Sequence, residues 1–213
     1  DWDRDIIYSG GKVVEKEGLF SGQTQLSSVT IGNQVKTIPY YAFANNSKLT
    51  SITIPESVTT ILYDAFKGCS ALHTVIIRPS DKFIKIYCQK DGDGTFYDAK
   101  LKHIELGRYI QAVNEYGNLY VAQNWNEGVF VNSSYSSVDE VTVIIGEKIT
   151  NINEYMFSHL NIKTLTVPST VGLLERYAFY NCDALKTVTL GAQQMESGVL
   201  YDCDALEEVT IKG

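Results

Sequence analysis

An internal repeat with a period of about 23 residues is the feature that most constrains how this chain can fold. Each copy has a Leu or Ile, apolar residues three and five positions later, a second apolar pair and then an Ala-Phe step or its equivalent. The clearest copies begin at Leu26, Leu49, Ile162 and Leu185. One such unit cannot bury its own apolar side chains, so stacked copies must cover one another. The repeat therefore predicts a solenoid.

The spacing within a copy predicts its local structure. In the copy that starts at Leu49, the alternation places Ile52 and Ile54 on one side of a short strand. Equivalent strands in successive coils should pair in parallel, about 4.8 Å apart. We expect Val58 and Ile61 to come from the returning arm of the coil. We also expect the Ala-Phe step to form a helical turn whose ring fills the gap between the two arms.

The middle of the chain keeps the pattern but lengthens it. The coil that starts at Leu72 has 29 residues and the coil that starts at Leu101 has 39, which is 6 and 16 more than the regular period. We count seven full coils between Leu26 and Leu206, and no linker-like composition divides them. We therefore predict one domain over residues 1–213, with a flank and partial coil in 1–25 and irregular long coils in 78–139.

The segments SVTTILYDAFKGCSALHTVII and TVGLLERYAFYNCDALKTVTL resemble BspA-type leucine-rich repeats of bacterial surface proteins, and the resemblance covers roughly residues 20–213. It implies an α/β right-handed leucine-rich-repeat solenoid. Such a solenoid has a parallel sheet on its concave face and short strands and helical turns on the other face. It also implies a non-enzymatic recognition or adhesion module at the outside of a bacterial cell. Its partners would be a host or bacterial surface protein or a glycan. The alternative is a structural spacer within a larger surface protein.

Composition narrows the classes of partner. The net charge is -7, which argues against nucleic acid and anionic membranes, because both need clustered Lys and Arg. No run approaches the roughly 18 apolar residues that would span a membrane. The chain opens on Asp1-Trp2-Asp3, so we interpret it as a trimmed piece of a longer protein whose export signal has been removed. We expect a monomer without a cofactor.

Two surfaces are candidates for binding. The first is the outward side of the predicted concave sheet, a ladder that is mostly Ser and Thr and that includes Thr53, Thr74, His103, Glu105, Thr142, Thr164 and Thr187. This ladder either merely suits an exposed parallel sheet or forms a broad, nearly neutral ligand face. The second is an aromatic group in the longest arm, formed by Tyr109, Tyr116, Tyr120, Trp125, Phe130 and Tyr135. These rings either cover an irregular coil or supply binding hot spots.

The sequence offers little for catalysis or metal binding. His73, His103 and His159 occupy unlike slots without metal-ligand spacing, so we predict no metal site. His103 and Glu105 form the best acid–base pair, but on an open sheet that excludes no water. Residues 90–95 resemble only the front of a calcium loop, and we prefer a solvated turn there.

The four cysteines raise a separate question. Cys182 and Cys203 share one slot of successive coils and should be neighbours. They are either buried thiols or a disulfide.

Overall fold

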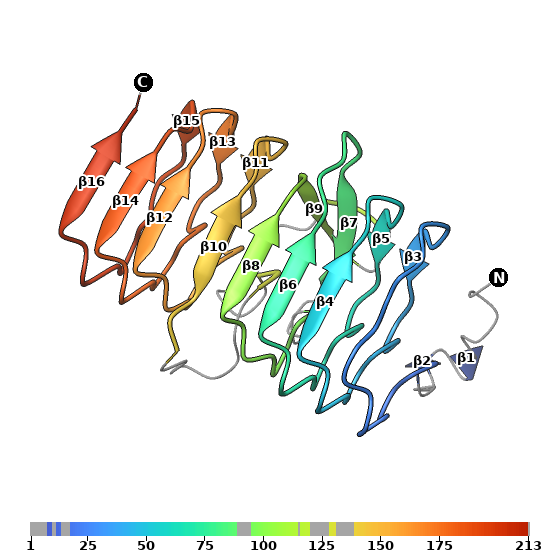
Figure 1. The fold of residues 1–213 in the computed structure, drawn as a ribbon. Helices are drawn as coiled ribbons and strands as arrows, with labels where there is room; N and C mark the ends of the chain where they lie inside the picture. Colours follow the sequence, from blue (N-terminus) through green and yellow to red (C-terminus); the bar gives the residue numbers. More distant parts are fainter. Residues whose placement is uncertain are drawn as a thin grey trace.

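The computed structural model describes residues 8–9, 12–13, 18–88, 95–114, 116–119, 128–130 and 139–212. Within these residues the chain winds as a single row of stacked coils from one terminus to the other (Figure 1). A separate antiparallel pair of strands, β1 (Tyr8–Ser9) and β2 (Lys12–Val13), precedes the coils. The predicted solenoid is therefore confirmed.

From Leu49 onward, each coil contributes one four-residue strand to the first side of the solenoid, which we call the long-strand face. These strands are β4 (Ser51–Ile54), β6 (Thr74–Ile77), β8 (His103–Leu106), β10 (Thr142–Ile145), β12 (Thr164–Val167), β14 (Thr187–Leu190) and β16 (Glu208–Ile211). They pair in parallel with no slip in register, as in Ile52↔Val75 and Val188↔Val209. The alternation predicts this register, because Ile52 and Ile54 are buried while Ser51 is exposed.

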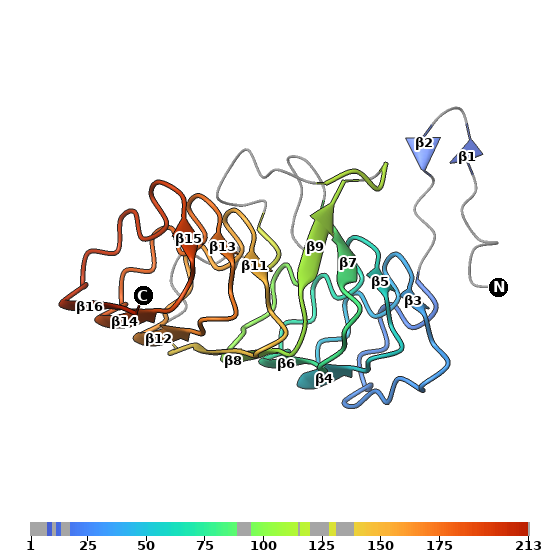
Figure 2. The same cartoon turned by 90° about the horizontal axis from the view of Figure 1, so that it is seen from above.

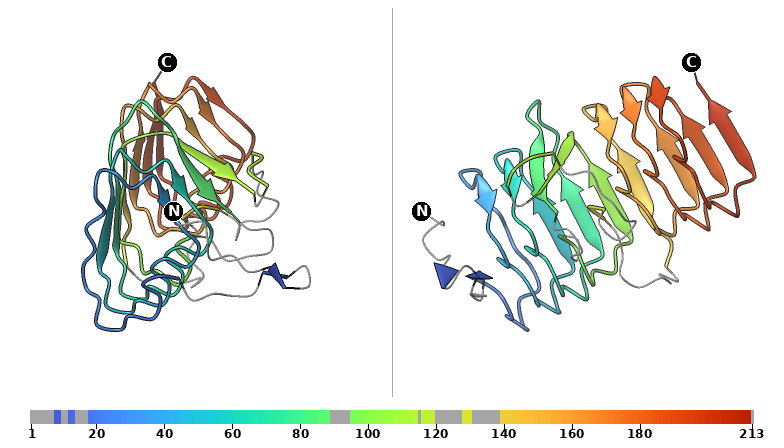
Figure 3. Two further views of the ribbon diagram at one scale, coloured as in Figure 1. Left: turned by 90° about the vertical axis from the view of Figure 1, so that its right-hand side faces the viewer. Right: turned by 180° about the vertical axis from the view of Figure 1, so that it is seen from behind.

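The second side carries shorter strands, and we call it the short-strand face. Its strands are β3 (Thr37–Ile38), β5 (Thr60–Ile61), β7 (Ile84–Tyr87), β9 (Ile110–Val113), β11 (Asn151–Ile152), β13 (Leu173–Leu174) and β15 (Gln194–Met195). Figure 2 shows the two rows of strands on separate sides of the coils, and Figure 3 shows the stack from one end and from behind. β7 and β9 are the longest strands of this face, and they belong to the two long coils that the sequence predicts.

Both sheets are interrupted, but at different places. The long-strand sheet divides into β4-β6-β8-β10 and β12-β14-β16, whereas the short-strand sheet divides into β3-β5-β7-β9 and β11-β13-β15. The breaks therefore lie one coil apart, so at least one sheet continues across each junction between neighbouring coils.

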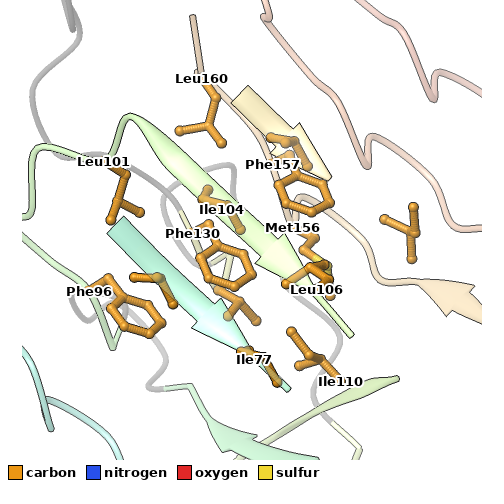
Figure 4. Packing of buried hydrophobic residues seen from close by; sticks show 14 of the residues in the cluster. Ile77, Phe96, Leu101, Ile104, Leu106, Ile110, Phe130, Met156, Phe157 and Leu160 are labelled. Carbon is orange, nitrogen blue, oxygen red and sulfur yellow. The ribbon is translucent and has the colours of Figure 1, made fainter. Parts of the chain in front are cut away.

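A column of phenylalanine rings crosses both junctions without a break. Seven rings stack face to face with centroids 5.4 to 5.6 Å apart and planes tilted by 5 to 13°; they are Phe20, Phe43, Phe66, Phe96, Phe130, Phe157 and Phe179. Figure 4 shows part of this column among the buried aliphatic residues. The centroid separations fall in the range that favours aromatic pairs. The phenylalanine column is thus a continuous element of the core.

The predicted helical turn at the Ala-Phe step is wrong, because no helix occurs anywhere in the described residues. The residue two before the ring and the residue two after it instead have positive φ, as at Tyr177 (59°) and Asn181 (53°) around Phe179. The Phe179 N–H donates to Val199 O of the next coil (3.0 Å) rather than within its own turn. The backbone therefore forms a third ladder between coils, which a helical turn would prevent.

Two further expectations differ from the structure or remain untested. The strand expected in the first coil is absent, since residues 26–31 form no strand although Leu26, Val29 and Ile31 pack against the core. An outermost coil has a neighbour on one side only, which weakens strand pairing there. The right-handed winding and the concavity of the long-strand face stay predictions.

Candidate functional site

The predicted aromatic group of the long coil is divided between different environments. Phe130 is fully buried in the phenylalanine column, so it is a core residue and cannot contact a ligand. Tyr109 is half-buried and lies edge-on to Phe83, with ring centroids 6.5 Å apart. Tyr116 is 80% exposed in a turn. The other members of this candidate, Tyr120, Trp125 and Tyr135, lie outside the described residues.

The predicted ladder on the long-strand face is present as an ordered row. Thr142, His103 and Thr74 pair directly across β10, β8 and β6, and Thr164 pairs with Thr187 across β12 and β14. Thr53 occupies the same face on β4, in the row that contains Glu105. All of these side chains are exposed or partly exposed. The structure therefore places these outward residues together in rows on both parts of the long-strand sheet.

The chemistry of this ladder is weakly polar. The Thr187 hydroxyl lies 3.3 Å from the Thr164 hydroxyl. The His103 Nε2 and Glu105 Oε2 atoms are 3.9 Å apart, and about a third of each side chain is exposed. This is a loose contact between two partly exposed side chains.

A second aromatic group, which the repeat pattern alone did not single out, lies beside the short-strand face of the C-terminal coils. We call Tyr155, Tyr177, Tyr180 and Tyr201 the tyrosine surface. Tyr155 stacks on Tyr177 (5.2 Å, 23°) and Tyr180 stacks on Tyr201 (6.0 Å, 11°). The two pairs meet edge to face, with Tyr177 5.9 Å from both Tyr180 and Tyr201. Four rings from three successive coils thus form one contiguous surface.

The repeat explains why these rings gather. Tyr155 and Tyr177 come two residues before the ring of the phenylalanine column, where the left-handed backbone turns the side chain away from the core. The next coil has Gly198 in that slot, and a Cβ atom there would lie 2.5 Å from Cε1 of Tyr177. Gly198 therefore leaves the space that the Tyr177 ring occupies. Tyr180 and Tyr201 each follow the column slot by one residue.

Charged side chains border the tyrosine surface on the side of β11, β13 and β15. Glu175 Oε2 accepts the Glu154 N–H (3.1 Å), and Glu196 Oε2 accepts the Arg176 N–H (2.9 Å). Each carboxylate therefore caps a backbone group of the preceding coil. Arg176 Nε donates to Glu154 Oε1 (3.0 Å), and its guanidinium lies over the Tyr177 ring, 5.7 Å from the centroid.

Burial and charge perturb the titration of this border. Burial raises the pKa of Glu154 although the Arg176 hydrogen bond lowers it, and only 8% of the Glu154 side chain is exposed. Burial also raises the pKa of Glu175, and the charges of Glu196 and Glu154 raise it further. These carboxylates stand in a row that crosses successive coils.

The other edge of the tyrosine surface is acidic as well. Burial and then the Asp202 charge raise the pKa of Tyr180. His159 contacts Tyr180 edge-on (5.4 Å). Burial lowers the pKa of His159, while the Asp183 charge opposes the shift. Carboxylates therefore lie on both sides of the four rings.

The cysteine alternatives are settled for this structure in favour of free thiols. All four cysteines are buried and free. Cys69, Cys182 and Cys203 donate to the carbonyl of the column phenylalanine one coil earlier, at 3.0, 3.3 and 3.2 Å. Burial raises the pKa of Cys69 to about 11, and the Cys203 thiol together with burial raises the pKa of Cys182. These shifts oppose formation of a thiolate at Cys69 and Cys182, whereas the hydrogen bond to the Cys182 thiol lowers the pKa of Cys203.

No group of three His, Cys, Asp or Glu side chains among the described residues is placed to hold a metal ion. No described helix has the length and apolarity to cross a membrane. An apolar cavity of about 330 Å³ lies at the N-terminal end of the stack, lined by residues such as Leu19, Val29 and Phe43.

Fold and surface together define a β-solenoid protein built from leucine-rich repeats. The chain belongs to the BspA-type leucine-rich-repeat family, whose model, the BspA type Leucine rich repeat region, matches residues 16–118 and 125–213 in six copies. This membership confirms the resemblance drawn from the repeat segments.

Two solved structures are similar to this chain. A leucine-rich cell surface protein from Faecalibacterium prausnitzii A2-165 is 15% identical with a TM-score of 0.37, over 91% of this chain and 62% of that one. A leucine-rich repeat protein from Bacteroides ovatus ATCC 8483 is 18% identical with a TM-score of 0.31, over 84% of this chain and 64% of that one. The chain thus spans less than two thirds of the length of either protein. No curated protein matches the chain.

Proposed function

We propose that this chain is a non-enzymatic recognition module displayed at a bacterial cell surface, where it binds an extracellular protein or glycan. The tyrosine surface carries the proposal. Tyr201 is 54% exposed and contacts the partly exposed Tyr177 and Tyr180, and the partly exposed Tyr155 contacts those two rings in turn. Tyrosine supplies large, rigid contact area at low cost in side-chain entropy, and it is enriched at binding hot spots.

Family membership supports the surface location, because the BspA-type repeats that this chain resembles are those of bacterial surface proteins. The arrangement of the acidic side chains supports a binding role over catalysis. Glu175 and Glu196 each use one carboxylate oxygen to cap a backbone N–H group of a neighbouring coil, so the two carboxylates are spread along the solenoid. General acid–base catalysis instead needs carboxyl groups that converge on one reacting bond.

A structural spacer is the second candidate, and the phenylalanine column favours it. Seven stacked rings and parallel ladders make a stiff rod, which would hold another domain away from the cell wall. A spacer needs no ligand, so binding discriminates between the two candidates.

The test is an array of extracellular matrix proteins and glycans probed with the whole 213-residue chain. We expect saturable binding with a Kd below about 1 mM. The double variant Tyr180→Ala/Tyr201→Ala should abolish it, whereas Tyr116→Ala, which removes an exposed ring elsewhere, should not. No ligand in this range would favour the spacer, and turnover of any arrayed substrate would overturn the non-enzymatic proposal. Labelling of intact cells with an antibody to the chain tests the location.

A further inference from the structure

We propose that the tyrosine surface and its carboxylate border bind a cationic polypeptide segment, one that presents several Lys or Arg side chains. This inference rests on the proposed function and narrows its partner from a protein or glycan to a basic peptide. Two observations carry it: the charge around the rings, and cations that the protein itself already places over tyrosine rings.

The charge around the tyrosine surface is unbalanced. On the β11–β13–β15 side, Glu154, Glu175 and Glu196 accompany one cation, Arg176. On the other side, Asp202 lies close enough to Tyr180 to affect its phenol. Asp183 acts in the same way on His159. The four rings therefore lie in a region of net negative charge, which attracts cations and repels anionic ligands.

The protein contains its own model of the contact. The Arg176 guanidinium lies 5.7 Å from the Tyr177 ring centroid while it hydrogen-bonds Glu154. In the N-terminal half, Lys67 Nζ lies 5.7 Å from the Tyr97 ring centroid. Lys67 and Tyr97 occupy the slot that Tyr180 and Tyr201 fill in the C-terminal coils. A cation on tyrosine is thus a contact that this slot already makes, and cation–π attraction accounts for it.

Charge, rather than ring geometry, favours a cationic segment over a neutral sugar. Tyr155 stacks on Tyr177 and Tyr180 on Tyr201, so one face of each ring lies against another ring. Cations and sugars both approach ring faces, and the carboxylates around the rings add attraction for the cation only. Successive coils lie about 4.8 Å apart. An extended peptide could therefore meet one ring or one carboxylate after another along the stack.

The peptide must contact several rings and carboxylates along the stack, because one contact would not suffice for binding. A single exposed ion pair or cation–π contact changes affinity by only about 2- to 5-fold. The effects of several contacts in a row on affinity multiply, because each further contact of a bound segment is intramolecular. The expected ligand accordingly has several cations close together in sequence, and its binding weakens as salt rises.

The probe is a fluorescent octapeptide of alternating Arg and Ser, with an octapeptide of alternating Glu and Ser and a neutral oligosaccharide, maltoheptaose, for comparison. Anisotropy titrations use the whole chain. Glu175→Gln/Glu196→Gln removes two charges while the amide oxygen can still cap the N–H groups. Glu147→Gln/Glu208→Gln removes two exposed charges elsewhere and gives the same net charge, so it controls for general attraction to an acidic protein.

We expect saturable binding of the cationic peptide only. The border double variant should weaken it by about 10-fold, the distant double variant by less than 2-fold and Tyr201→Ala by about 5-fold. Equal weakening by both charge variants, or no saturable binding, would overturn the proposal. If maltoheptaose or the acidic peptide bound instead and Tyr201→Ala abolished it, this inference would fall while the proposed recognition function stood. If neither these probes nor the matrix and glycan array gave a ligand, both would fall.

Discussion

Replacing Phe130 with Ala tests whether the phenylalanine column holds the two halves of the solenoid together. Phe130 is fully buried and stacks on Phe96 (5.4 Å) and Phe157 (5.6 Å). It belongs to the long coil, and the short-strand sheet is interrupted between β9 of that coil and β11 of the next. The ring therefore packs across a junction where one of the two sheets does not.

The expected magnitude follows from burial and from the two ring contacts. A buried Phe→Ala substitution costs about 3–5 kcal/mol from lost transfer free energy and the cavity left behind. Each aromatic pair adds about 0.5–1.5 kcal/mol beyond burial, so two lost pairs put the loss near 5 kcal/mol. Phe20, at the end of the column, is 44% exposed and has one ring partner, Phe43. Its replacement by Ala should cost only about 1 kcal/mol.

Equilibrium urea denaturation, followed by far-ultraviolet circular dichroism, measures both losses. Phe130→Leu is the matched control, because Leu200 fills the column slot in the last full coil, and it should cost less than half as much as Phe130→Ala. The reasoning is refuted if Phe130→Ala costs less than about 2 kcal/mol, or no more than Phe20→Ala. A second, earlier transition in Phe130→Ala would indicate that the halves then unfold separately, as nearest-neighbour coupling in solenoids predicts.

Three further outcomes are expected. Arg108→Met should destabilise the fold by about 3 kcal/mol in the same assay. The buried guanidinium donates to Pro55 O (2.9 Å) and Glu56 O (3.0 Å) two coils away, so both carbonyls would lose a charged partner. A change below about 1 kcal/mol would contradict this. Burial raises the pKa of Glu175, so the Glu175 carboxyl group binds a proton more tightly in the folded protein than in the unfolded chain. The ionised carboxylate therefore destabilises the fold at neutral pH, and this destabilisation is relieved as pH falls through the folded pKa. Glu175→Gln should therefore be more stable than the parent at pH 7 and show a smaller gain between pH 7 and pH 5, and equal pH dependence of the two proteins would count against it. At Cys69, reaction with a disulfide reagent should be slow in the native protein and fast in urea, because burial raises the pKa of its thiol to about 11; rapid native reaction of Cys69 would contradict this.

The sequence was sufficient for the fold because the core repeats. Apolar side chains recur at the same five positions of each coil, so the alternation alone predicts that Ile52 and Ile54 point inward, and both are buried. The long coils were also located from spacing alone. The conformation of the Ala-Phe step was not predicted correctly, because it depends on N–H groups that bond to the next coil, as Phe179 N does to Val199 O. Such a contact between coils leaves no local sequence pattern, and an Ala-Phe pair suits a helix equally well in isolation.

The proposed binding surface was harder to predict because exposure and neighbourhood are tertiary properties. Six aromatic residues in the long arm formed a dense group in sequence, yet Phe130 lies in the core. The tyrosine surface is dispersed in sequence from Tyr155 to Tyr201, and only the stacking of coils brings it together. A usable signal existed in the repeat alignment: Tyr155 and Tyr177 share one slot outside the core pattern, and Tyr180 and Tyr201 share another.

A third surface slot shows how the solenoid can change its surface without changing its fold. In the N-terminal coils the slot three residues before the column ring holds Tyr40 and Tyr63, whose rings are 4.2 Å apart. In the C-terminal coils that slot holds Glu154 and Arg176, which form an ion pair instead. Neither pair belongs to the phenylalanine column, so this slot carries different side chains on the same repeat. Each coil can therefore vary its contribution to the surface independently, while the shared register keeps neighbouring contributions about 4.8 Å apart.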